Sequence, residues 1–119
     1  MNKFRDWVEQ IPIESVSHQI VAINFNLYET DDEECFHAQL IACDSYDANN
    51  DDWACKPIFS SEENIYEFEA EDWEDALDKF KNRVSTYLKE NVESQINKIA
   101  IITAGFVDGD IITIKPTDD

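Results

Sequence analysis

The chain has 119 residues, with 27 Asp and Glu against nine Lys and Arg, so its formal net charge is −18 and its pI is near 4.1. This length fits one domain, residues 1–119, and an apolar fraction of 43% supplies a core, which excludes compositional disorder. The charge excludes direct binding to nucleic acid or to an anionic membrane, because phosphate groups are bound by clustered Lys and Arg.

Targeting and cofactor signals are missing from the sequence. It has no apolar run of about 18 residues, and its first ten residues lack the apolar core and cleavage site of a signal peptide. Cys35, Cys43 and Cys55 are odd in number and form no Cys-x-x-Cys pair, which predicts reduced thiols, with one disulfide in a secreted protein as the alternative. The two glycines cannot build a phosphate-binding loop. We therefore expect a cytoplasmic protein without a cofactor.

The first half of the chain predicts a short helix and three strands. Apolar residues at helical spacing predict a helix over 3–11, which Pro12 ends. Alternation predicts a strand over 18–28, with Asn24 and Asn26 facing away from the core, and a second strand over 35–43. The run 53–59 predicts a third strand, at an edge because Pro57 cannot donate a ladder hydrogen bond.

The second half predicts a long helix followed by two strands. An apolar stripe that begins at Trp73 predicts a helix over about 70–90, with acidic residues in its first turns and basic residues further on, which suits the helix dipole. The run 98–104 is apolar on both faces and predicts a central strand. Asp108-Gly109 between apolar runs predicts a hairpin turn.

These elements predict an α+β fold. Short connections favour a two-layer sandwich, in which an antiparallel sheet of about five strands carries the short N-terminal helix and the long helix on one face. The other face would then be half apolar and available to a partner. Strand order does not follow from the sequence, and we expect a monomer or a weak homodimer.

The charge is concentrated in one segment of the chain. Residues 29–78 hold 18 acidic residues and a single basic one, Lys56, a net charge of −17, whereas residues 79–119 are neutral. Charge runs are usually solvated surfaces. However, so many excess charges destabilise a small domain by self-repulsion, and the neighbouring segment avoids this cost. We therefore interpret residues 29–78 as a recognition surface for a cationic protein.

Aromatic residues lie within the acidic segment. Tyr and Trp commonly anchor interfaces. Tyr46, inside an acidic loop, favours an interface, and Trp53 suits a core or an interface equally well. Trp73 heads the apolar stripe of the long helix, so its periodicity predicts a core position.

Catalytic and metal-binding patterns are weak. Cys35 and His37 share a strand face, but Cys43 lies roughly 26 Å further along, and zinc sites usually show closer paired spacings. The aspartates of 44–52 lack the central Gly and terminal Glu of a helix-loop-helix calcium site. No Ser occupies a Gly-x-Ser-x-Gly elbow, and carboxylate pairs in so acidic a chain indicate nothing. We expect no metal site and no enzymatic activity.

The chain as a whole resembles a known class of proteins. Its size, its acidity and the contexts Asp-Asp-Trp at 51–53 and Glu-Asp-Trp-Glu-Asp at 71–75 are similar to those of small bacterial immunity proteins of contact-dependent inhibition and polymorphic toxin systems. The resemblance implies a protein that binds a cognate toxin, often a basic nuclease, and either plugs its active site or covers an adjacent surface. A DNA-mimic inhibitor and a small metal-binding regulator or enzyme remain alternatives.

This interpretation assigns carboxylates that pair with Lys and Arg of the toxin and three aromatic anchors, Tyr46, Trp53 and Tyr66. The expected toxin-binding residues are Asp31, Asp32, Glu33, Glu34, Asp44, Tyr46, Asp47, Asp51, Asp52, Trp53, Glu62, Glu63, Tyr66, Glu67, Glu69, Glu71 and Asp72.

Overall fold

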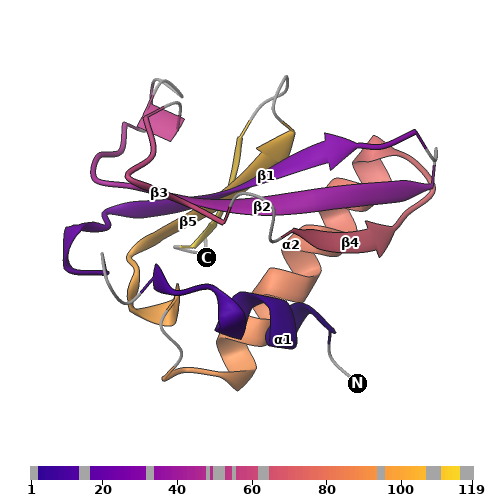
Figure 1. Cartoon of the computed structure of the whole chain (residues 1–119). Helices are drawn as coiled ribbons and strands as arrows, with labels where there is room; N and C mark the ends of the chain where they lie inside the picture. The colour runs from indigo at the N-terminus through magenta and orange to yellow at the C-terminus, as the bar shows by residue number, and fades with distance from the viewer. Residues whose placement is uncertain are drawn as a thin grey trace.

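The computed structural model describes residues 3–13, 17–31, 34–47, 49, 53–54, 56–61, 65–93, 96–106 and 111–115. Figure 1 shows the path of the chain. The elements in order are α1 Lys3–Gln10, a short 3₁₀ helix η2 Ser17–Gln19, β1 Ala22–Glu29, β2 Cys35–Cys43, β3 Phe59–Ser60, β4 Tyr66–Glu69, α2 Trp73–Glu90, a second 3₁₀ helix η4 Ile96–Lys98, β5 Ile101–Phe106 and β6 Ile112–Lys115. The fold is α+β, as the sequence predicts.

The sheet is mixed, so the prediction of a purely antiparallel sheet is wrong. Its order is β3-β2-β1-β5-β6, and β4 pairs with the other end of β2 from β3. β1 is antiparallel to β2 but parallel to β5. The parallel pairing of β1 with β5 is possible because the connection between β2 and β5 contains all of α2. A connection with a whole helix is long enough to bring the chain back beside β1 in the same direction.

Of the three strands predicted in the first half of the chain, 35–43 matches the structure closely, 18–28 overlaps β1 but has the end of η2 at its first two residues, and 53–59 does not match. The predicted strand 35–43 is β2, with the two faces that its alternation indicates, and 18–28 corresponds to β1. The predicted strand 53–59 is wrong, because residues 53–54 form part of a helical turn and β3 begins only at Phe59, beyond Pro57. β4 was not expected. The Asp108-Gly109 turn lies outside the described residues, between the antiparallel strands β5 and β6.

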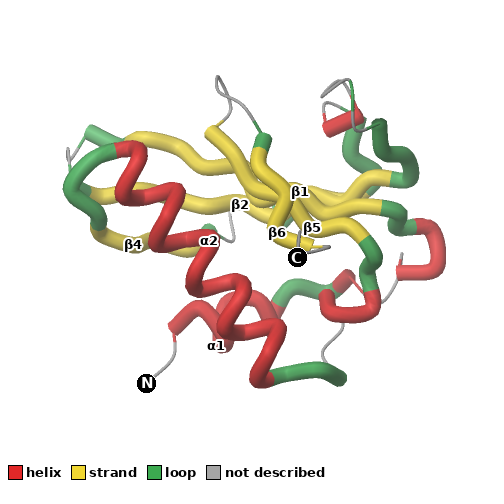
Figure 2. Tube along the Cα trace, turned by 180° about the vertical axis from the view of Figure 1, so that it is seen from behind, coloured by secondary structure: helices red, strands yellow, loops and turns green. Residues whose placement is uncertain are grey.

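Both helices lie on the same side of the sheet (Figures 1 and 2). The predicted helices 3–11 and 70–90 correspond to α1 and α2. Their apolar stripes and the facing strand residues form the main core, with Phe4 fully buried at its centre. The Phe4 ring packs against five other rings at centroid distances of 5.4–6.2 Å: Trp7, Phe25, Tyr66, Phe80 and Tyr87. This aromatic cluster joins α1 and α2 to the sheet.

The opposite face of the sheet is covered over one half by the chain itself. Trp53 and Tyr46 pack there with Ala22, Ile41 and Cys43. Asn24 also faces this side but is only 2% exposed, so the expectation of a single buried face on this strand is wrong. Its Oδ1 accepts a hydrogen bond of 2.8 Å from the hydroxyl of Thr103, which satisfies the buried amide.

Among the residues that the structure describes, neither helix combines the length and the apolar character needed to cross a membrane.

Candidate functional site

Two acidic segments that are distant in sequence meet at one end of the sheet. The connection between β1 and β2 and the connection between β4 and α2 lie side by side, because the backbone N–H of Ala70 donates to the Glu34 carbonyl at 2.9 Å. Both connections are at the right-hand end of the sheet in Figure 1. We call this region the acidic end. Its exposed carboxylates among the described residues are Glu29, Asp31, Glu34, Glu69, Glu71, Asp72 and Glu74.

Trp73 lies within the acidic end and is the most exposed of its aromatic residues. Its side chain is 53% exposed, so the prediction that Trp73 belongs to the core is wrong. Trp73 is the first residue of α2, and its ring contacts Phe106 edge-on at 6.4 Å at the end of β5. Periodicity places the side chain on the apolar face of the helix, but Phe106, the last residue of β5, contacts only part of the indole.

Two aspartates stabilise the start of α2. Asp72 is the N-cap, and its carboxylate accepts from the backbone N–H of Asp75 at 2.8 Å. The Asp75 carboxylate accepts in turn from the backbone N–H of Glu71 at 2.9 Å and pairs with Lys79 at 3.0 Å. The Glu71 N–H, followed by Lys79, lowers the pKa of Asp75, and Asp75 raises the pKa of Lys79. Asp72 thus has a structural role beside its predicted binding role.

The third acidic segment lies at the opposite end of the sheet. Asp44 and Asp47 are exposed and follow the last residue of β2, roughly 26 Å along the strand from its first residue. Tyr46 is half-buried and packs edge-to-face on Trp53 at 5.1 Å. Trp53 is only 5% exposed and packs in the small core on this face of the sheet. It therefore cannot serve as a surface anchor for a partner. The structure therefore unites two of the three acidic segments.

Tyr66 and Glu67 have surroundings that the sequence did not indicate. Tyr66 is 5% exposed within the aromatic core, so little of its ring is available to a partner. Its hydroxyl accepts a hydrogen bond from Arg83. Glu67 is exposed on the other face of β4 and pairs with His37 at 3.0 Å. The remaining predicted residues lie outside the described part of the chain: Asp32, Glu33, Asp51, Asp52, Glu62 and Glu63.

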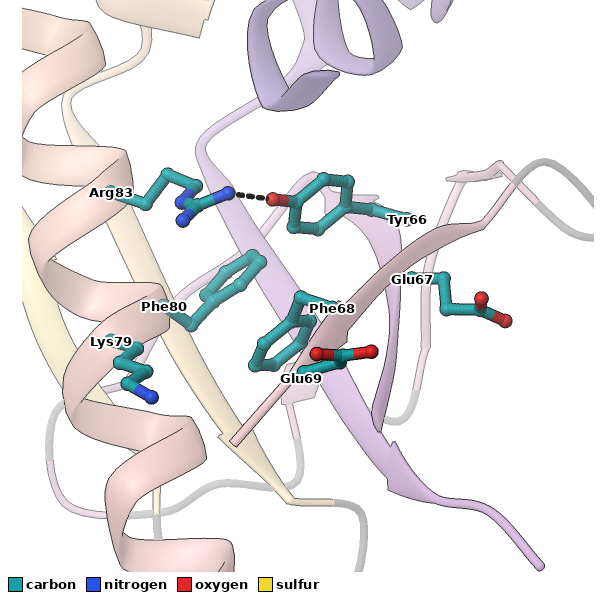
Figure 3. Close-up of a pocket in the computed structure, with 7 residues that line it drawn as sticks. All are labelled: Tyr66, Glu67, Phe68, Glu69, Lys79, Phe80 and Arg83. Carbon is teal, nitrogen blue, oxygen red and sulfur yellow. Dashed lines mark hydrogen bonds between the residues drawn. The ribbon is translucent and has the colours of Figure 1, made fainter. Parts of the chain in front are cut away.

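A groove of about 440 Å³ runs between β4 and α2, next to the acidic end. Figure 3 shows Arg83 of α2 directed toward the Tyr66 hydroxyl, with the rings of Phe68 and Phe80 between the two elements. The groove is also lined by Glu67, Glu69 and Lys79. The lining of the groove therefore combines both signs of charge with aromatic rings.

No protein-family model matches the chain, and no curated protein or solved structure matches it significantly. The functional argument therefore depends on the surface of this chain alone.

Proposed function

We propose that this protein is an immunity protein that neutralises a basic bacterial toxin by binding it at the acidic end. One observation carries the proposal: the half-exposed indole of Trp73 lies at the end of the sheet where two acidic segments that are distant in sequence meet. A tryptophan that loses its solvent when the partner binds, within a rim of polar contacts, is a common arrangement of interface hot spots. Trp73 takes the anchoring role that the sequence had suggested for Trp53 and Tyr66.

The charge supports a cationic protein as the partner. Between residues 29 and 78 the chain has no Lys or Arg except Lys56. The carboxylates of the acidic end therefore repel one another and attract positively charged surfaces. This attraction speeds association with a basic partner and orients the partner. The scaffold that we propose is the two-layer sandwich, with the helices on one face of the sheet and the binding surface at the acidic end, where the β1–β2 and β4–α2 connections meet. We further propose that the protein acts in the cytoplasm, as a monomer, without catalytic activity.

The test is capture and inhibition of the partner with matched variants. The tagged chain is incubated with lysate of its native cell, washed with rising salt, and the retained protein is purified and assayed for toxic activity. For that pair, we expect Trp73→Ala to weaken the complex by about 2 kcal/mol or more, roughly 30-fold in Kd. Glu71→Gln with Glu74→Gln should slow association and flatten its dependence on salt.

The control removes the same charge at the opposite end of the sheet. Asp44→Asn with Asp47→Asn should leave both the association rate and the affinity near those of the unchanged protein. If both pairs of substitutions slow association equally, the acidic end is not the docking surface. If many basic proteins are retained together and elute with added DNA, the chain is a DNA mimic and not a dedicated inhibitor.

A further inference from the structure

Three different metal-ligating side chains converge on the face of the sheet opposite the helices. They are Cys35 and His37 of β2 and Glu67 of β4, and one possible ligand atom of each lies within 4.8 Å of the other two. His37 Nε2 and Glu67 Oε2 are 3.0 Å apart. Cys35 and His37 are half-buried, whereas Glu67 is exposed, so an ion from solvent can reach the cluster.

The backbone holds these three side chains together. Cys35 and His37 are two residues apart on one strand, so they point to the same face. Glu67 is the direct cross-strand partner of His37, and Glu69 is that of Cys35. All three ligands therefore stand on paired strands and not on loops, which fixes their relative positions more closely than a loop would.

The spacing is close to that of a tetrahedral zinc site. Zinc bond lengths of about 2.1 Å to nitrogen or oxygen and about 2.3 Å to sulfur give separations of about 3.4 Å between N and O and about 3.6 Å between S and N. The observed 3.0 Å between His37 Nε2 and Glu67 Oε2 and the limit of 4.8 Å for the whole cluster bracket these values.

We propose that Cys35, His37 and Glu67 bind one zinc ion, with a solvent molecule in the fourth position. A thiolate, an imidazole and a carboxylate together suit zinc, whereas calcium and magnesium prefer oxygen ligands alone. The net charge of −18 further favours a divalent cation. The site lies on the face of the sheet opposite the helices and does not use Trp73, although Cys35 is the cross-strand partner of Glu69 of the acidic end.

The test uses the full chain, stripped of metal with a chelator and kept reduced. Zn²⁺ is titrated by calorimetry, and Co²⁺ is titrated by absorption in the presence of excess Mg²⁺. We expect one ion per chain and a thiolate-to-cobalt charge-transfer band. Since outer-shell substitutions already cost about 10–100-fold in metal affinity, loss of a ligand in Cys35→Ser, His37→Gln or Glu67→Gln should weaken Zn²⁺ binding by about 100-fold or more.

Matched controls distinguish a specific zinc site from the general attraction of cations to an acidic protein. His18→Gln and Glu71→Gln remove an imidazole and a carboxylate of exposed residues elsewhere and should change zinc affinity by less than about twofold. Circular dichroism shows that each variant is folded. The proposal is overturned if Co²⁺ gives no thiolate band with the unchanged chain, if the band survives Cys35→Ser, or if Glu71→Gln weakens binding as much as Glu67→Gln.

Discussion

The buried hydrogen bond between Thr103 of β5 and Asn24 of β1 predicts how one substitution changes the stability of the fold. Thr103 is 1% exposed, and its hydroxyl donates to Asn24 Oδ1 at 2.8 Å, with the Ile23 carbonyl further away at 3.2 Å. Thr103→Val keeps the shape of the side chain but replaces the hydroxyl with a methyl group. The substitution therefore removes the donor from a buried amide oxygen.

The expected cost follows from that geometry. A buried acceptor that loses its donor costs about 1–3 kcal/mol. For a domain of this size, each kcal/mol lowers Tm by about 4 °C, so we expect a decrease of about 4–12 °C. Urea unfolding should show a lower midpoint with an unchanged slope, because the surface exposed on unfolding stays the same.

The cross-strand neighbour of Thr103 supplies the control. Thr113 is paired with Thr103 but exposed, so Thr113→Val makes the same atomic change in solvent and should alter stability by less than about 0.5 kcal/mol. The double variant Asn24→Val with Thr103→Val removes both polar partners and should cost less than the sum of the single variants. Equal effects of Thr103→Val and Thr113→Val, or full additivity, would refute the reasoning.

Three further predictions concern the start of α2. Asp72→Ala removes the N-cap and should lower the free energy of unfolding by about 1 kcal/mol in urea titrations, whereas Asp72→Ser should keep most of it. The lowered pKa of Asp75 means that its contribution is complete above the unfolded pKa near 3.8 and is lost as pH falls through the folded pKa, so Asp75→Asn should flatten the acid limb of the stability curve below the unfolded pKa; an unchanged limb would contradict this. Trp73→Phe should remove most of the fluorescence that acrylamide quenches, since Trp7 and Trp53 are 6% and 5% exposed; quenching that persists would place Trp73 in a covered environment.

The candidate site could be predicted in part from the sequence. Charge alone predicts the acidic segments 29–34 and 62–75, but their meeting depends on the pairing of β4 with β2, and no local pattern predicts β4. The same missing strand hid the Cys35, His37 and Glu67 cluster, because Glu67 is 30 residues from His37 in sequence. The sequence predicts a core position for the exposed Trp73 and a surface position for the buried Tyr66, and it leaves Trp53 open between core and interface, since local context does not reveal which ring a neighbouring element covers.

The sequence by itself determined the elements whose signals are local. Helical periodicity defined α1 and α2, alternation defined both faces of β2, and the charge imbalance located the acidic segment. Only the tertiary structure decided the parallel pairing of β1 with β5, the exposure of Trp73 and the burial of Trp53 and Asn24. The physical reason is that periodicity reports which side of an element is apolar. Which segment covers that side, and where the cover ends, depends on long-range packing that no local pattern contains.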